Sequence, residues 1–173
     1  MDISSLIRTV PDFPRMGVQF KDVTTLLQNG PAFKYIIDGW RDRYSGKDVH
    51  TIVGADARGF IFASALAYSM ELPIALVRKK GKLPHVTISE EYDLEYGTDT
   101  LEMHVDALRA DERVVIVDDL LATGGTMAAS VRLVEKLGAD IVEITCVVEL
   151  PPLKGREKLA GYPVHTLVEY MVE

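Results

Sequence analysis

The chain has 173 residues, of which 47% are hydrophobic and 26% charged, a balance typical of a globular protein and not of a disordered one. Its 19 basic and 26 acidic residues give a formal net charge of −7, which argues against a nucleic-acid binder, because such proteins carry a basic face. No apolar run approaches the roughly 20 residues of a membrane-spanning helix, and the start, MDISSLIRTV, lacks the pattern of a secretory signal. The single cysteine, Cys146, excludes an internal disulfide. We therefore expect one cytoplasmic domain, residues 1–173, with no membrane or nucleic-acid partner.

The N-terminal part of the chain predicts an ordered loop followed by a helix. Residues 1–30 are punctuated by Pro11, Pro14 and Gly17, which favour turns over regular structure. A helix is predicted near residues 31–44.

Two similar units follow, each made of an apolar run, a loop, a helix-length segment and a second apolar run. The first unit comprises TIVG (51–54), ADARG, FIFASALAYSM (60–70) and IALVR (74–78). The second comprises VVIV (114–117), DDLLATGGT, MAASVRLVEKL (127–137) and IVEITCVVEL (141–150), and PVHTLVEYMV predicts a last strand. Apolar strands alternating with helices indicate an α/β fold, a parallel twisted sheet with helices on both faces. In such sheets ligands bind where strands end and helices begin, which is where both loops lie.

The loop of the second unit has the composition of a phosphate site. Asp118 and Asp119 mark the end of the strand, and a small, glycine-containing turn leads into the helix through Ala122, Thr123, Gly124, Gly125 and Thr126. Small residues let backbone N–H groups converge on an anion at a helix N-terminus, and the threonine hydroxyls can donate to phosphate oxygens. The two carboxylates suit ribose hydroxyls or a Mg²⁺ shell. A plain strand-to-helix turn with Thr126 as the N-cap is the alternative, but two adjacent acids repel one another in such a turn unless a cation is near.

A basic cluster stands out in this acidic chain. Four basic residues fall within five positions, and Arg58 in the loop of the first unit adds a fifth; the four are Arg78, Lys79, Lys80 and Lys82. Alone, the cluster is typical of a solvated basic turn. Beside a phosphate loop it indicates a site where negative charge accumulates on a leaving group. Residues 79–103, polar with strand-like pieces, predict a flap over that site.

The phosphate segment resembles the signature of the type I phosphoribosyltransferases. The resemblance extends along nearly the whole chain to the adenine-specific members of that family, through PDFP, GVQFKD, ARGF, RKKGKLP, LEYG, DDLLATGGT and LKGREKL. It implies transfer of the 5-phosphoribosyl group from phosphoribosyl diphosphate to adenine, which gives AMP and pyrophosphate in purine salvage. It also implies Mg²⁺ carried by the diphosphate, with no direct protein ligand, and a homodimer.

The resemblance further implies a role for each segment of the site. Asp118 and Asp119 hold the ribose hydroxyls, and residues 122–126 hold the 5′-phosphate. Arg58 binds pyrophosphate from the loop of the first unit, and Arg78 and Lys82 reach it from the neighbouring subunit. Lys79 of the basic cluster is a further contact, with Lys80 as the alternative. A cis peptide bond is implied around Asp56 and Ala57.

The resemblance places the base at the N-terminal segment and the proton acceptor in the flap. Phe20 stacks on adenine, while main-chain groups of Gln19 and Lys21 address its amino edge. Glu95 accepts the proton that the attacking ring nitrogen sheds, and Tyr96 lies beside it in the flap. Without the resemblance, Phe20 is more simply an anchor of its loop to the core.

Two alternatives stay open at this point. Transfer to guanine, hypoxanthine or xanthine needs donors where adenine needs acceptors, since those bases carry a carbonyl in place of the amino group. The second alternative is a regulatory protein that has the same fold and binds a nucleotide or phosphoribosyl diphosphate without catalysing a reaction. The four histidines show no metal-ligand spacing, and LKGREKL (153–159) has no chemical role that its residues indicate.

Overall fold

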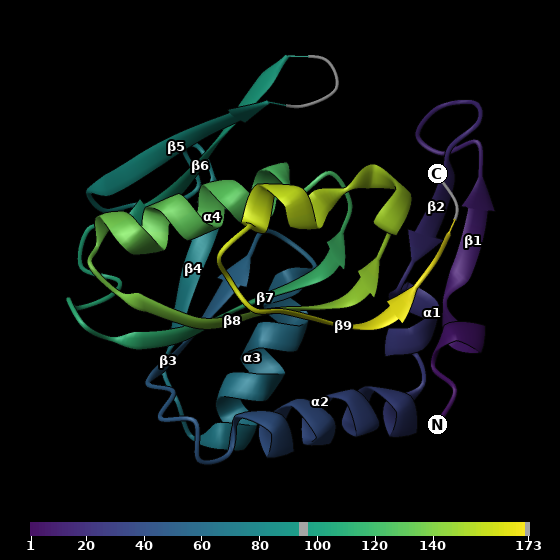
Figure 1. The fold of residues 1–173 in the computed structure, drawn as a ribbon, viewed down its shortest axis with the longest axis horizontal. Helices are drawn as coiled ribbons and strands as arrows, with labels where there is room; N and C mark the ends of the chain where they lie inside the picture. The colour runs from purple at the N-terminus through teal and green to yellow at the C-terminus, as the bar shows by residue number, and fades with distance from the viewer. Residues whose placement is uncertain (94–96, 172–173) are drawn as a thin grey trace.

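A single sheet of seven strands forms the centre of the computed structural model, which describes residues 1–93 and 97–171 (Figure 1). The strand order is β5-β6-β4-β3-β7-β8-β9. The strands are β3 (Thr51–Ala55), β4 (Ile74–Lys79), β5 (Thr87–Asp93), β6 (Thr98–His104), β7 (Arg113–Leu121), β8 (Asp140–Glu149) and β9 (Val164–Glu169). The five strands from β4 to β9 in that order pair in parallel, whereas β5 and β6 pair antiparallel with their neighbours. The prediction of a parallel sheet is thereby confirmed for its central part.

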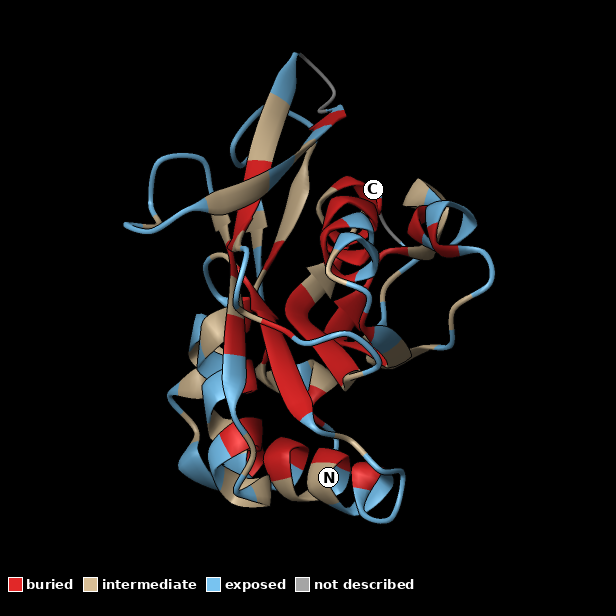
Figure 2. Cartoon of the chain, turned by 90° about the vertical axis from the view of Figure 1, so that its left-hand side faces the viewer, coloured by how far each residue is buried: buried red, intermediate tan, exposed pale blue. Residues whose placement is uncertain are grey.

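Helices cover both faces of this sheet, as the alternating pattern predicts (Figure 1). Helices α2 (Gly30–Tyr44) and α3 (Gly59–Met70) pack on one face, and α4 (Gly125–Lys136) packs on the other. Each face has its own cluster of buried side chains, and Figure 2 shows burial concentrated on the central strands. None of the helices in the described residues is both long and apolar enough to cross a membrane.

Local sequence signals fix the ends of these helices. Asn29 precedes α2, and its side chain accepts a hydrogen bond from the backbone N–H of Ala32 at 3.1 Å, the usual N-cap contact. Gly138 follows α4 with a φ of +80°, a conformation that glycine adopts without a Cβ clash. The predicted helices near 31–44 and 127–137 are therefore confirmed with shifted starts.

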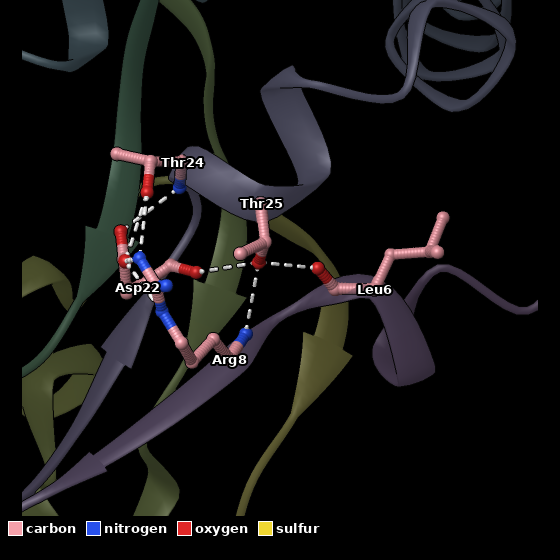
Figure 3. A network of polar contacts seen from close by, with 5 residues as sticks. All are labelled: Leu6, Arg8, Asp22, Thr24 and Thr25. Carbon is pink, nitrogen blue, oxygen red and sulfur yellow. Dashed lines mark hydrogen bonds and ion pairs between the residues drawn. The ribbon is translucent and has the colours of Figure 1, made fainter.

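The prediction of a loop for residues 1–30 is partly wrong. Strands β1 (Arg8–Pro11) and β2 (Gln19–Asp22) form a two-stranded antiparallel ribbon, followed by the short helix α1 (Thr24–Leu27). Polar contacts fix the base of the ribbon to α1 (Figure 3). The guanidinium of Arg8 binds the Asp22 carboxylate at 2.5 Å, and the Thr25 hydroxyl donates to the carbonyl of Leu6 at 2.6 Å. Hydrogen bonds from Arg8, opposed in part by desolvation, lower the pKa of Asp22 to about 2.

The predicted flap is a hairpin that extends the sheet. Strands β5 and β6 pair antiparallel, and β6 pairs with the end of β4 at Arg78. Glu90 of β5 binds two basic side chains of α4, Arg132 at 2.7 Å and Lys136 at 2.5 Å, so the base of the flap is tied to that helix. The expected proton acceptor Glu95 lies outside the described residues, as does Tyr96.

Candidate active site

The loops that follow β3 and β7 meet at the carboxyl edge of the sheet and line a cavity of about 380 Å³. The two strands are neighbours in the sheet and run parallel, so their loops emerge side by side. The lining residues come from these loops, the end of β7, the start of α4 and the flap: Asp56, Ala57, Arg58, Lys79, Tyr92, Asp93, Asp118, Asp119, Leu120, Leu121, Ala122, Thr123, Gly124, Gly125, Thr126 and Met127.

The turn from Ala122 to Thr126 forms one wall of this cavity and opens helix α4. Gly124 is the N-cap, with a left-handed φ of +77°, and α4 begins at Gly125. The alternative in which Thr126 caps the helix is therefore wrong. The first turn of this twelve-residue helix, whose N–H groups have no acceptor within the helix, lines the cavity together with Thr123, an arrangement that binds anions.

Asp118 and Asp119 lie beside this turn and are both buried, with 8% and 5% of their surfaces exposed. Burial, together with the charge of Asp119, raises the pKa of Asp118 well above its usual value. The guanidinium of Arg58 supplies a counter-charge, because its Nε lies 2.5 Å from Oδ2 of Asp119. The arginine of the neighbouring loop thus offsets the repulsion between the adjacent acids.

The same arginine connects the carboxylates to the N-terminal ribbon. The guanidinium carbon of Arg58 lies 5.4 Å from the centre of the Phe20 ring, and Phe13 meets that ring edge-on at 5.1 Å. Gln19, Phe20 and Lys21 do not themselves line the cavity, yet Phe20 adjoins it through Arg58.

The side chain of Lys21 points away from Arg58 and Phe20. Its ammonium donates to the Thr9 hydroxyl at 2.8 Å and lies 4.3 Å from the centre of the Tyr170 ring. Lys21 is 6% exposed, and desolvation lowers its pKa. Successive residues of a strand face opposite sides, so only the backbone of Lys21 is available on the side of Phe20.

The basic cluster divides into two parts. Lys79 lines the cavity and binds Asp99 of the flap at 3.3 Å. Arg78 binds Asp56 at 3.3 Å and donates to the carbonyl of Lys82, and neither Arg78 nor Lys82 lines the cavity of its own chain. The peptide bond between Asp56 and Ala57 is cis, as the resemblance implies.

Sequence reasoning missed the flap residues Tyr92 and Asp93. Tyr92 is 8% exposed and lies against the phosphate turn, since a Cβ added at Gly125 would come within 3.1 Å of its ring. The available signal was that Tyr92 is one of two tyrosines in a largely polar flap. Its contact with Gly125 depends on the hairpin pairing, which the sequence alone does not give.

Comparison with known proteins identifies the family of this chain. Residues 23–166 match the family model described as "Phosphoribosyl transferase domain". The chain is 52% identical over 170 residues to the adenine phosphoribosyltransferase of Roseiflexus castenholzii, an alignment that covers 98% of this chain and 99% of the relative.

Solved structures of the same group share the fold. The adenine phosphoribosyltransferase of Thermoanaerobacter pseudethanolicus superposes with a TM-score of 0.94 at 48% identity, covering 98% of both chains. The enzyme of Saccharomyces cerevisiae, complexed with an imino-altritol bisphosphate and adenine, superposes with a TM-score of 0.92 at 37% identity, covering 96% of this chain and 97% of that one. This chain therefore belongs to the phosphoribosyltransferase family and, within it, to the adenine phosphoribosyltransferases.

Proposed function

We propose that this chain transfers the 5-phosphoribosyl group of phosphoribosyl diphosphate to adenine, giving AMP and pyrophosphate. The observation that carries the proposal is one cavity in which two buried carboxylates adjoin an anion-binding helix N-terminus, while Arg58 connects Asp119 to Phe20. These groups suit a substrate that has a phosphate for the helix N-terminus, a vicinal diol for the carboxylates and a flat base for Phe20.

Each part of the cavity has a role in binding the sugar phosphate. The turn 122–126 receives the 5′-phosphate through its N–H groups and threonine hydroxyls. Asp118 and Asp119 accept hydrogen bonds from the ribose hydroxyls once Arg58 leaves Asp119. Arg58 and Lys79 then face the pyrophosphate, where positive charge stabilises the negative charge that develops on the leaving group. Rate acceleration comes from orientation and electrostatics, because no protein nucleophile is required.

The ribbon strand β2 supplies the base site. Phe20 offers a flat apolar surface for stacking, and one edge of β2 pairs with β1 while the other has no strand partner in the described part of the chain. An open strand edge presents both N–H and C=O groups, which suits the ring nitrogen and amino group of adenine through Gln19 and Lys21. Glu95 of the flap accepts the proton that the base sheds, with Tyr96 beside it.

Mg²⁺ enters as part of the substrate in this proposal. Four carboxylates line the cavity, Asp56, Asp93, Asp118 and Asp119, but the described residues contain no group of three or more acidic, histidine or cysteine side chains arranged to hold a metal. This donor set fits an ion whose ligands come mainly from diphosphate oxygens. When bound, the ion neutralises charge on the diphosphate; the protein holds the complex through Arg58 and Lys79.

The proposal includes a cytoplasmic homodimer in which residues 1–173 act as one domain. Ile61 and Tyr68 lie seven residues apart on one face of α3 and are 44% and 88% exposed, and Ile74 at the start of β4 is 38% exposed. Such apolar exposure suits an interface. Arg78 and Lys82 lie outside their own cavity, which suits a role at the partner's site. Cys146 is buried and free, which suits a reducing compartment.

The test is formation of AMP from phosphoribosyl diphosphate and Mg²⁺, with adenine, guanine, hypoxanthine and xanthine supplied separately. We expect turnover with adenine and none with the three carbonyl-bearing bases. Turnover with another base would keep the phosphate and ribose assignments and overturn the assignment of β2 to adenine recognition. Tight binding of phosphoribosyl diphosphate without turnover of any base would instead favour the alternative of a regulatory protein that senses this ligand.

A further inference from the structure

The segment LKGREKL (153–159) packs directly against the phosphate turn. Its core is the short 3₁₀ helix Gly155–Leu159 (η3), which lies beside the N-terminal end of α4 and is drawn in yellow in Figure 1. Gly155 is buried, and it is the residue of this segment that meets the turn.

The contact is made by backbone on both sides. A Cβ added at Gly155 would lie 2.3 Å from the carbonyl oxygen of Ala122, and a Cβ added at Gly124 would lie 2.5 Å from the carbonyl oxygen of Gly155. Either approach is closer than non-bonded atoms tolerate. Because backbone atoms cannot rotate aside as a side chain can, a displacement of Gly155 is passed directly to the turn.

Arg156, the next residue, fixes the position of this segment. Its Nε donates to Oε1 of Glu149 and its Nη2 donates to Oε2, each at 2.7 Å. Its Nη1 donates to the carbonyl of Val164 at 2.9 Å. The Glu149 side chain is 5% exposed and also accepts from the Thr166 hydroxyl at 2.9 Å. Burial acts against ionisation of Glu149, but the hydrogen bonds from Arg156 and Thr166 outweigh it and lower its pKa.

Glu149 in turn belongs to the strand that supports the site. It is the last residue of β8 and pairs with Leu121, the residue that immediately precedes the phosphate turn. Leu159 closes the other end of η3 in the core against α4, with 2% of its surface exposed. The segment is therefore held at both ends, and the turn from Ala122 to Gly124 lies between β7 on one side and Gly155 on the other.

We propose that Gly155 and Arg156 are positioning residues for the 5′-phosphate: Arg156 sets the place of Gly155, and Gly155 sets the backbone of the phosphate turn. This inference rests on the proposed function for the identity of the ligand. Neither residue needs to touch substrate. Substituting either residue should weaken binding of the sugar phosphate and leave recognition of the base at β2 unchanged.

The experiment uses Gly155→Ala and a matched control, Gly39→Ala in α2, where an added Cβ meets nothing within 4 Å and φ is not positive. Three quantities are measured: the Kd of ribose 5-phosphate by calorimetry, which needs no turnover, the KM of phosphoribosyl diphosphate and the KM of adenine. We expect Gly155→Ala to raise the Kd and the KM of the sugar phosphates roughly 10- to 100-fold, as a misplaced binding group does. The KM of adenine should stay within about twofold, and Gly39→Ala should match the wild type in all three.

Arg156→Lys provides a second variant should Gly155→Ala fail to fold. It keeps the charge but loses the bidentate contact, so we expect the same split between sugar phosphate and adenine at a smaller magnitude. Equal losses for both substrates, or unchanged ribose 5-phosphate binding in folded variants, would overturn the inference. If the wild type binds ribose 5-phosphate but makes no AMP, the proposed function fails while the calorimetric comparison still decides the positioning role.

Discussion

The surroundings of Asp118 oppose its ionised form. Its carboxylate is buried next to Asp119, and the nearest cation, Arg58, binds the other aspartate. A buried acid beside a like charge favours its protonated form, which is the direction of the pKa shift. Hydrogen bonds donated by ligand hydroxyls would favour the ionised form of Asp118, so ligand binding and ionisation of this carboxyl support one another.

Replacing Asp118 with Asn should therefore stabilise the protein at neutral pH. The pKa of Asp118 is higher in the folded than in the unfolded chain, so the folded state binds more protons and wild-type stability falls as pH rises from about 4 through the raised pKa. Asp118→Asn removes that fall, and we expect a gain on the order of 1 kcal/mol above that range, or about 2–4 °C in Tm. Thermal unfolding across pH, with the exposed Asp106→Asn as control, measures it.

The same variant should lose ribose 5-phosphate binding, since an amide accepts fewer hydrogen bonds from the diol than a carboxylate does. Equal pH slopes in the wild type and Asp118→Asn would show that burial at this position carries no electrostatic cost.

At this scale the sequence predicts what is local. Asp118, Asp119 and the turn 122–126 are contiguous, so their composition alone indicates an anion site. The contacts of Arg58 with Asp119 and Phe20 join three distant segments, and no local pattern contains them. The opposite orientation of Lys21 is equally hidden, because it depends on Tyr170 far along the chain.

Among the elements, α2 is attached to the sheet by an ion pair that the proposed reaction does not use. Arg43 near its end donates from Nε and Nη2 to the two carboxylate oxygens of Glu143 in β8, at 2.6 and 2.8 Å. The Glu143 side chain is 6% exposed, and although burial opposes ionisation, the Arg43 hydrogen bonds lower its pKa. The pair lies on the face of α2 and α3, away from the cavity lining.

Glu143→Gln should lower the free energy of unfolding by about 1–3 kcal/mol, because the bidentate acceptor is lost while Arg43 stays half-buried. The kcat and the KM for adenine should stay at wild-type values. Chemical denaturation gives the first quantity and steady-state kinetics the others. A normal stability would mean that solvent replaces the contact, and a changed kcat would mean that α2 reaches the site.

Element prediction succeeds where hydrophobic periodicity is strong and fails in the N-terminal ribbon. The helices and the central strands bury continuous or periodic apolar residues, so their patterns are visible. Strands β1 and β2 have four residues each, and Pro11, Pro14 and Gly17 occur in or between them. Pairing with each other and contacts such as Arg8–Asp22 hold them extended, and these are not properties of either strand alone.

At the scale of the whole molecule, the proposed dimer predicts that two variant subunits can complement each other, which a monomer does not allow. If Arg78 acts at the partner's site, two inactive variants can restore each other. A chain with Arg78→Ala has intact carboxylates, and a chain with Asp118→Asn and Asp119→Asn has an intact Arg78. A mixed dimer then contains one complete site. Co-expression with random pairing should give about a quarter of wild-type activity, because half the dimers are mixed and half their sites are complete.

Each parent variant alone should give little turnover, whereas the separately tagged, co-purified mixed dimer should form AMP at about half the wild-type rate, because one of its two sites is complete. If Arg78 instead acts in its own subunit, each site of the mixed dimer lacks one group and activity does not return. A monomeric chain on gel filtration would refute the dimer directly.

The tie between Lys21 and Tyr170 also bears on the order in which the two halves of the site can form during synthesis. The ribbon that carries Phe20 is made before the sheet, yet the buried ammonium of Lys21 rests on the ring of Tyr170, whose hydroxyl donates to the carbonyl of Ser4 at 2.8 Å. The phosphate turn is supported only once residues 155–166 are made, because it packs on Gly155 and Arg156 donates to the carbonyl of Val164. The base end waits longer still, for Tyr170, some 150 positions after Lys21, so it is the last part of the cavity that can form.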